Sequence, residues 1–382
     1  MRAVENPRIY LDYNASTPIA PEVVEAVTKL LPHSYGNPSS QHWAALPAHE
    51  AVEKARGQVA ALLCCSPEEI VFTSGGSEAN NHALKGVYFM RDRDSHIVTT
   101  TVEHPAILGP CRFLERLGAS VTYVPVDRYG RVDPDDVASA ITQRTVLISV
   151  MHANNEVGTL QPIVDIARIA RERGILFHTD AAQTVGKMTT HVDELGVDLL
   201  SVVGHKMYAP KGVGALFIRK GIRLESLIHG ADHESGRRAG TENALLDAAL
   251  GVACEVAQSW VQRDSIRELR DLFWNLLQSQ FGERVVLNGH ATERLPNTLN
   301  VSFVGKIGAE ILAGLPNVAA STGSACHSGS IQLSPVLKAM AVSPEVGMGA
   351  IRFSLGRSTT EEEIRSAADS LREVMSATEA PQ

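Results

Sequence analysis

Five short polar segments of this 382-residue chain carry side chains that bind ligands or move protons in enzymes. They lie at residues 73–77, 103–104, 154–156, 178–183 and 204–206. Each follows a short apolar run that is typical of a buried strand. Ligands of open parallel sheets bind beyond the carboxyl ends of the strands, so we expect these segments to meet at one crevice.

The first of these segments is rich in glycine and joins an expected strand to an expected helix. It reads Thr-Ser-Gly-Gly-Ser and ends with Gly75, Gly76 and Ser77. Glycines let the backbone approach an anion, and a helix N-terminus offers free N–H groups, so the segment suits a phosphate. It matches neither a P-loop nor a dinucleotide fingerprint, which disfavours nucleoside triphosphates and dinucleotides. Taken alone, it is equally well explained as an ordinary strand-to-helix turn.

The ionisable residues are compatible with two kinds of site. Taken singly, each histidine is explained as a structural residue and Asp180 as a helix N-cap. The histidines lack the short spacing of a zinc site and Lys206 would oppose a dication, so no metal is expected. Together, a lysine, an acid, a histidine and a phosphate cradle fit pyridoxal 5'-phosphate. The lysine forms the Schiff base, the acid holds the ring nitrogen, and the helix N-terminus binds the phosphate.

Alternating strand and helix patterns over the first two thirds of the chain predict the elements that position these residues. Strand-like runs lie at 70–73, 97–101, 121–126, 146–150, 175–177, 199–203 and 215–218. Helical patterns lie between them, at 21–31, 44–63, 77–91 and 163–173. This alternation predicts an α/β fold with a mostly parallel sheet covered by helices on both faces.

The pattern changes after Glu242. One long helical pattern runs to about residue 280, and short strands at 285–287, 300–303 and 351–354 then mix with helices. This texture is typical of a smaller α+β domain joined to the first by a long helix. We expect an N-terminal arm at 1–14 associated with the small domain, a large ligand-binding domain at 15–255, and a small C-terminal domain at 256–382.

Composition and charge exclude several classes of protein. Hydrophobic residues make up 44% of the chain and charged residues 20%, as in globular rather than disordered proteins. The net charge of -8 disfavours direct nucleic-acid binding. No signal peptide or membrane-spanning run is visible, and the five cysteines form no CxxC pair. We therefore expect a cytoplasmic protein without a disulfide framework.

Further motifs extend the pattern over nearly the whole chain. They are Tyr-Leu-Asp-Tyr-Asn-Ala-Ser-Thr-Pro at 10–18, Gly-Asn-Pro-Ser-Ser at 36–40, Gly-Thr-Glu-Asn at 240–243, Ser-Ala-Cys at 324–326 and Ile-Arg-Phe-Ser-Leu-Gly-Arg at 351–357. With the strand-end segments, they resemble the class V aminotransferase family, and within it the NifS/IscS-type cysteine desulfurases and selenocysteine lyase. The resemblance implies PLP-dependent transferase fold type I, with a large domain and a smaller C-terminal domain.

The resemblance implies how each polar residue would bind the cofactor. Lys206 would bond it covalently, Asp180 would keep its ring nitrogen protonated, and Gln183 would contact its phenolic oxygen. His104 would stack on the ring, and Asn155 would also contact the cofactor. Its phosphate would be held by Gly75, Gly76, Ser77, His205 and, from the second subunit of a homodimer, Thr241.

The resemblance also implies a substrate site. Arg352, with Asn155 and Asn14, would hold the substrate carboxylate, since a guanidinium donates two parallel hydrogen bonds to such a group. Val203 departs from the pattern of many desulfurases, which place a phosphate-binding serine at this position. Selenocysteine lyases also read Val-Gly-His-Lys here.

Cys326 would be the sulfur acceptor within the chain. Most free cysteines are small buried hydrophobes, but this one lies in a polar Gly/Ser segment at 321–330. Its distance from the helix start at 334–337 resembles the long catalytic loop of the IscS-like group. The resemblance implies that Lys206 removes the α-proton of L-cysteine and that the Cys326 thiolate takes the sulfur, releasing alanine, with His104 a candidate for proton transfers.

Two alternatives to a cysteine desulfurase are compatible with these residues. Selenocysteine lyase is supported by Val203 and the Ala-Cys-His-Ser run, whereas Pro105 after His104 favours cysteine. A non-catalytic scaffold with the same fold is disfavoured because the set of lysine, aspartate, arginine and cysteine is complete.

The expected partners follow from the same resemblance. They are L-cysteine, a second copy of the chain, and a protein that accepts the persulfide sulfur. An iron–sulfur scaffold and systems for tRNA thiolation, DNA phosphorothioation or cofactor synthesis are all compatible acceptors, and the sequence does not distinguish among them.

Overall fold

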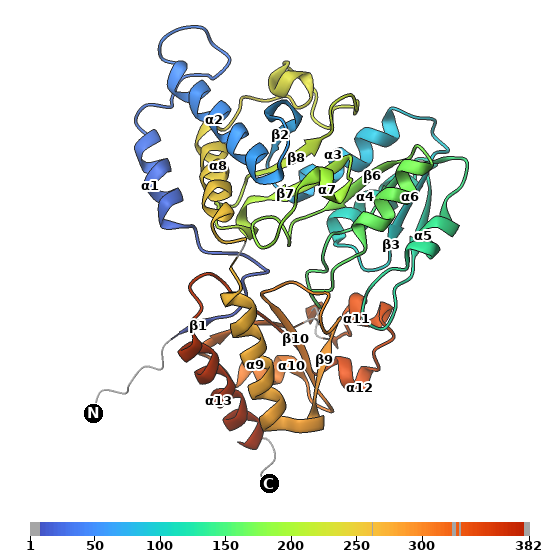
Figure 1. Cartoon of the computed structure of the whole chain (residues 1–382), viewed down its shortest axis with the longest axis vertical. Helices are drawn as coiled ribbons and strands as arrows, with labels where there is room; N and C mark the ends of the chain where they lie inside the picture. The colour runs from blue at the N-terminus through green and yellow to red at the C-terminus, as the bar shows by residue number, and fades with distance from the viewer. Residues whose placement is uncertain (1–7, 262, 323–325, 328–329, 378–382) are drawn as a thin grey trace.

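The protein forms two lobes in a computed structural model that describes residues 8–261, 263–322, 326–327 and 330–377 (Figure 1). The upper lobe holds a large sheet between helices, and the lower lobe holds a smaller sheet with the helices α9 (Ser265–Phe281) and α13 (Glu361–Ala377). The first described strand, β1 (Ile9–Tyr10), belongs to the lower lobe and not to the large sheet that follows it in sequence.

A seven-stranded sheet in the order β2-β8-β7-β6-β5-β3-β4 forms the centre of the upper lobe. Every pairing is parallel except the two made by β8. The strands are β2 (Ile70–Thr73), β3 (His96–Thr100), β4 (Ser120–Val124), β5 (Thr145–Ser149), β6 (Leu176–Asp180), β7 (Leu199–Val203) and β8 (Gly214–Ile218). The predicted mostly parallel sheet is confirmed, although β6 extends past the predicted residue 177 to Asp180.

Helices cover both faces of this sheet. One face is covered by α1 (Pro21–Leu30), α2 (Leu46–Leu63), α5 (Pro134–Ala140), α6 (Ile163–Glu172), α7 (Val192–Leu195) and α8 (Ala244–Gln258). The other is covered by α3 (Gly76–Phe89) and α4 (Pro105–Glu115). Successive strand residues point to opposite faces, so Phe72 joins the first core while its neighbour Val71 joins the second. Burial on both faces explains why these strands read as continuous apolar runs.

The lower lobe contains a four-stranded antiparallel sheet in the order β12-β15-β10-β9. Its strands are β9 (Val285–Asn288), β10 (Thr298–Phe303), β12 (Ser321–Thr322) and β15 (Ala350–Ser354). The helices of this lobe are α9 (Ser265–Phe281), α10 (Gly308–Ala313), α11 (Pro335–Ala339), α12 (Pro344–Gly347) and α13 (Glu361–Ala377). A separate hairpin pairs β13 (Cys326–His327) with β14 (Ser330–Ile331). Short 3-10 turns complete the chain at Pro67–Glu69, Gly204–Lys206, His233–Gly236 and Gly282–Arg284.

The single long helix predicted after Glu242 is wrong. The structure has two helices, α8 and α9, separated by residues 259–264. No glycine or proline marks this break in the sequence. Tertiary packing decides it, because α8 packs on α2 in the upper core and α9 on β10 in the lower one. Trp260 lies in this break, and the guanidinium of Arg263 is 4.3 Å from the centroid of its ring.

The N-terminal segment packs with the lower lobe before the chain enters the upper one. β1 (Ile9–Tyr10) pairs in parallel with β11 (Val318–Ala319), and Ile9 and Leu11 lie in the lower core beside α9, β15 and α13. The predicted arm at 1–14 and the predicted border near residue 255 stay proposals. The separate cores of α8 and α9 support them.

Two absences hold for the part of the chain that the structure describes. None of its helices is both long and apolar enough to cross a bilayer. Within the same residues, no three His, Cys, Asp or Glu side chains lie close enough together to hold a metal ion.

We predict that Gly356→Ala destabilises the protein. A Cβ at this position would lie 1.9 Å from Cε1 of Tyr13, the residue where the N-terminal segment leaves the lower lobe. The ring of Tyr13 is buried against Tyr10 and its hydroxyl hydrogen-bonds Ser358, so it has little room to move. We expect a loss of about 2 kcal/mol in the free energy of unfolding, measured by denaturant titration.

Gly57→Ala is the matched control. Gly57 lies within α2, and no atom lies within 4 Å of the position its Cβ would take. This variant should be more stable by about 0.5–1 kcal/mol, since alanine favours a helix over glycine. Equal stability of the two variants would contradict the packing argument.

Candidate active site

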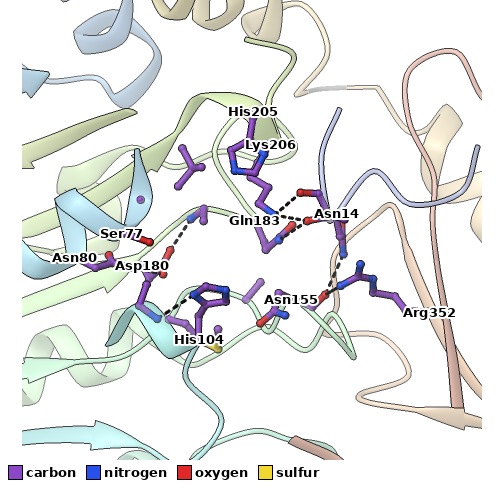
Figure 2. Close-up of a pocket in the computed structure, with 17 residues that line it drawn as sticks. Asn14, Ser77, Asn80, His104, Asn155, Asp180, Gln183, His205, Lys206 and Arg352 are labelled. Atoms are coloured by element: carbon purple, nitrogen blue, oxygen red, sulfur yellow. Dashed lines mark hydrogen bonds between the residues drawn. The ribbon is translucent and has the colours of Figure 1, made fainter. Parts of the chain in front are cut away.

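A cavity of about 430 Å³ lies where the carboxyl ends of the large sheet face the lower lobe. Most of the residues predicted from the sequence line it, from both lobes and from the N-terminal segment (Figure 2). They are Asn14, Gly76, Ser77, His104, Asn155, Asp180, Gln183, His205, Lys206 and Arg352. The structure thus brings together residues from nearly the whole length of the chain, from Asn14 to Arg352.

Asp180 is the last residue of β6 and is almost completely buried. Its Oδ2 accepts a hydrogen bond from Asn80 Nδ2 at 2.7 Å, and its Oδ1 accepts one from the Ala182 backbone N–H at 2.9 Å. These two donors fix the carboxylate toward the cavity, where it can pair with a cationic group. Asn80 was missed from the sequence, although it lies on α3, the helix that begins at Gly76.

Lys206 ends the turn after β7, and its amine reaches across the cavity to the N-terminal segment. Nζ donates to the backbone oxygens of Asn14 at 2.6 Å and Ala15 at 2.8 Å. Burial, aided by the positive charge of Arg352, lowers the pKa of this amine to about 8. A sizeable neutral fraction therefore exists near neutral pH, as a nucleophile or a base requires.

His104 is the N-cap of α4, and its Nδ1 accepts a hydrogen bond from the Ala106 backbone N–H at 3.1 Å. This bond leaves the proton of the neutral ring on Nε2. The ring is open to the cavity. Partial burial of the ring, together with the positive charge of Lys206, lowers the pKa of His104. A neutral ring can lie against a flat ligand without adding charge.

The glycine segment forms the backbone turn that the sequence predicted. Gly75 has φ 143°, a conformation that favours glycine, and α3 begins at the next residue with its first N–H groups free. Ser77 is exposed in the first turn. A Cβ on Gly76 would lie 2.5 Å from Cγ2 of Val203, so Val203 is part of this cradle and limits Gly76 to glycine.

His205 lines the same part of the cavity and remains neutral. Burial, together with the charges of Lys206 and Lys211, lowers its pKa to about 4. A neutral imidazole still has one N–H to donate to an anion.

Arg352 enters the cavity from β15 of the lower lobe and is nearly buried. Its NH1 donates to the backbone oxygen of Asn155 at 2.9 Å, and its NH2 donates to Asp12 Oδ1 at 2.7 Å. Asp12 was not singled out from the sequence, although it lies in the motif at 10–18. The guanidinium is held in place and lies where an incoming carboxylate can reach it.

Three predicted site residues do not line this cavity. Gly75 directly precedes Gly76 in the chain, at the turn before α3. Thr241 is exposed and is not among the residues that line the cavity. The backbone of Cys326 lies in β13, while its side chain lies outside the described part of the structure.

The residues present fit the predicted cofactor. The cavity combines a lysine amine of lowered pKa, a buried carboxylate fixed by two donors, an open imidazole ring and a helix N-terminus. An aldehyde, a pyridine nitrogen, a flat ring and a phosphate are the complementary groups, and pyridoxal phosphate has all four. The fold and cavity are those of an α/β protein with a lysine-centred site for such a cofactor.

The chain belongs to the aminotransferase class-V family, whose model matches residues 9–366. A cysteine desulfurase IscS of Dictyoglomus turgidum is 48% identical over 372 residues, covering 96% of this chain and 94% of that relative. Among solved structures, a NifS-like protein matches with a TM-score of 0.91 at 36% identity, over 97% of this chain and 100% of that one. A structure titled SspA in complex with cysteine matches with a TM-score of 0.82 at 38% identity, over 91% and 98% of the two chains. The predicted family and fold class are confirmed.

We predict that the cofactor-free protein reacts with pyridoxal phosphate at a rate that rises with pH and levels off above about 8. Only the neutral Lys206 amine attacks an aldehyde, and its pKa is lowered to about 8. Below that value the rate should fall about tenfold per pH unit. Stopped-flow absorbance between pH 6 and 10 measures it.

Arg352→Gln is the informative variant for this profile. Removing the guanidinium takes away a charge that lowers the pKa of Lys206 and leaves Asp12, which raises it. The midpoint should therefore move to higher pH. An unchanged midpoint would show that Arg352 does not act on the amine.

Proposed function

We propose that the protein is a pyridoxal-phosphate-dependent cysteine desulfurase that converts L-cysteine to L-alanine and passes the sulfur to a protein acceptor. The observation that carries this proposal is one cavity that holds the Lys206 amine, the Asp180 carboxylate and the Arg352 guanidinium. The relatives named cysteine desulfurase IscS, and the similar structure with cysteine bound, support the substrate. Selenocysteine, which has the same carboxylate and amine, is the second candidate because Val203 lines the cradle.

The residues of the cavity divide the binding of cofactor and substrate between them. Lys206 would bond the cofactor, Asp180 would hold its ring nitrogen, His104 would pack on its ring, and Gln183 would contact its phenolic oxygen. Gly75, Gly76 and Ser77, at the start of α3, would hold its phosphate with His205. Arg352, Asn155 and Asn14 bind the substrate carboxylate. When bound, pyridoxal phosphate supplies an electron sink for the pair released from the substrate Cα–H bond.

The chain's own groups then move the proton and the sulfur. Lys206 Nζ accepts the α-proton, a role that its lowered pKa permits. The Cys326 thiolate attacks the substrate sulfur, so an S–S bond forms as the substrate Cβ–S bond breaks and its electron pair stays on carbon. Protonation of that carbon and return of a proton from Lys206 Nζ to Cα give alanine, and the outer sulfur of the Cys326 persulfide passes to the acceptor. His104 Nε2, which carries the ring proton, is suited to such a proton transfer.

We predict that Cys326→Ala binds the cofactor but releases no alanine from L-cysteine. The α-proton step needs only Lys206 and the cofactor, whereas the sulfur needs a thiolate to receive it. Alanine is measured by amino-acid analysis, and a persulfide on Cys326 by mass spectrometry of the wild type. Selenocysteine is assayed in parallel, since the weaker C–Se bond does not demand the same nucleophile.

Two control variants sharpen this experiment. Cys64→Ala removes an exposed cysteine that lies at the end of α2 and does not line the cavity, so this variant should retain full turnover. Lys206→Ala should lose the yellow colour of the covalently bound cofactor. Full turnover by Cys326→Ala would remove Cys326 from the mechanism. A colourless wild-type protein would contradict the proposal that it binds pyridoxal phosphate.

The protein further acts as a homodimer in which Thr241 binds the cofactor phosphate of the partner subunit. Thr241 is exposed and does not line the cavity of its own chain. The adjacent Glu242 lines a second hollow together with residues 38–41, so the two motifs lie on one face. Nearby, Tyr35 and Trp43 are 70% and 76% exposed, which suits a surface that a second copy covers.

We predict that two inactive variants restore activity when they share a dimer. Lys206→Ala lacks the cofactor lysine, and Thr241→Glu places a negative charge against the partner's phosphate. In a mixed dimer, one site combines the intact Lys206 of one chain with the intact Thr241 of the other. Co-expression with two different tags and purification on both gives this species, expected at about half of wild-type activity. A mixed species without activity, or an active monomer in sedimentation, would contradict the shared site.

The sulfur acceptor and a cytoplasmic location stay predictions. The acceptors considered are an iron–sulfur scaffold and systems that thiolate tRNA, phosphorothioate DNA or synthesise cofactors. Each is tested by transfer of ³⁵S from labelled L-cysteine to the purified candidate.

A further inference from the structure

Lys187 is a second lysine beside the cavity, and neither the sequence motifs nor the proposed mechanism uses it. It follows Gln183 by four residues, in the turn after β6. Its Nζ donates to Gln183 Oε1 at 2.8 Å and to Asn14 Oδ1 at 3.1 Å. In the described residues no carboxylate lies within ion-pair distance of this amine, so its polar partners are two side-chain amides.

An amine next to two amides decides which way each amide faces. An N–H of Lys187 must meet an oxygen, so Oε1 of Gln183 faces the lysine and Nε2 faces the other way. Nε2 then donates to the Asn14 backbone oxygen at 3.1 Å. In the reverse orientation, Nε2 would meet an amine and Oε1 would meet a carbonyl oxygen. Both hydrogen bonds would be lost at a nearly buried residue, which is costly.

The fixed orientation decides what the cavity presents to a ligand. Figure 2 shows Gln183 beside Asn14 and Lys206, with its amide at the cavity. Nε2 has two N–H groups, and only one is taken by Asn14. The other is a donor available to the ligand next to the lysine amine.

We infer that Lys187 is a positioning residue that holds the Gln183 amide with its N–H toward the cavity, so that the site selects a ligand oxygen that accepts a hydrogen bond. The inference rests on the proposed function, in which the phenolic oxygen of pyridoxal phosphate is that acceptor. It assigns Lys187 no contact with the cofactor and no part in proton transfer.

The positioning does not depend on the charge of the lysine. Burial, with the positive charges of Lys206 and Arg352 nearby, lowers the pKa of Lys187 well below its ordinary value. A neutral amine still has two N–H groups, one for Gln183 and one for Asn14. The amine can thus orient both amides without adding a third full cation to the cavity.

A double-mutant cycle distinguishes positioning from a general structural role. Lys187→Met keeps the shape of the chain and removes both donors, and Gln183→Ala removes the amide on which Lys187 acts. Cofactor affinity is measured by titrating each cofactor-free protein with pyridoxal phosphate, and the pH midpoint of the visible absorbance is recorded for each loaded form. Lys220→Met, which replaces an exposed lysine, is the matched control.

We expect Lys187→Met to weaken cofactor binding about tenfold and to shift the absorbance midpoint, while Lys220→Met matches the wild type. The double variant should bind no more weakly than Gln183→Ala alone, because Lys187 acts through Gln183. Additive losses, or a Lys187→Met protein that behaves as Lys220→Met does, would overturn the inference. A wild type that binds no pyridoxal phosphate would instead overturn the proposed function.

Gln183→Glu tests the same idea if Lys187→Met does not fold. The carboxylate keeps an acceptor for Lys187 and Asn14 holds the lysine as before, but no N–H faces the cavity. Cofactor affinity should fall at least as far as in Lys187→Met. Unchanged affinity would overturn the need for a donor at this position.

Discussion

Asn14 is the residue through which both lobes and Lys206 are joined. Its backbone oxygen accepts hydrogen bonds from Lys206 and Gln183, and its side-chain oxygen accepts them from Lys187 and Asn297. Its Nδ2 donates to Thr298 at 2.8 Å, and its backbone N–H donates to Ser354. Because Asn14 is almost completely buried, its own polar atoms depend on these bonds rather than on water. The cavity therefore has its working shape only when the N-terminal segment lies between the two lobes.

Burial at this junction also sets the electrostatics of the cavity. Lys206, Lys187 and Arg352 lie around one residue, and burial lowers the pKa of both lysines. Asp12 and Asp180 supply negative charge, but Asp12 is bound to Arg352 and Asp180 to donors on its own lobe. The cavity thus favours anionic ligands while keeping its lysine partly neutral. A phosphate and a carboxylate, which the proposed cofactor and substrate carry, are the groups that such a field attracts.

The sequence predicts the large sheet and most of the residues that line the cavity because both depend on local pattern. The strands are marked by runs of β-branched residues. The polar, ionisable side chains follow the carboxyl ends of these strands, where open parallel sheets bind their ligands. What it does not predict depends on contacts between distant residues. Asp12 reaches Arg352 and Asn80 reaches Asp180 only in the folded chain, and the break between α8 and α9 follows from packing in two cores without a local signal. The resemblance to a family supplied the individual roles, which pattern alone left open.

The segment that carries Cys326 begins and ends at acids that lie close to Arg352. Before it, Ser321 Oγ donates to Asp12 Oδ1 at 2.9 Å, the same oxygen that binds Arg352. After it, Ser334 Oγ donates to Glu156 Oε2 at 2.5 Å, next to Asn155, whose backbone oxygen accepts from Arg352. Ser334 is also the N-cap of α11, so the end of the segment is fixed to a helix. Both ends of the segment are thus bonded to acids, Asp12 and Glu156, that lie close to the guanidinium of Arg352. A carboxylate bound there lies close to both attachment points of the segment that would supply the thiolate, although Cys326 is far from Asp12 and Glu156 in sequence.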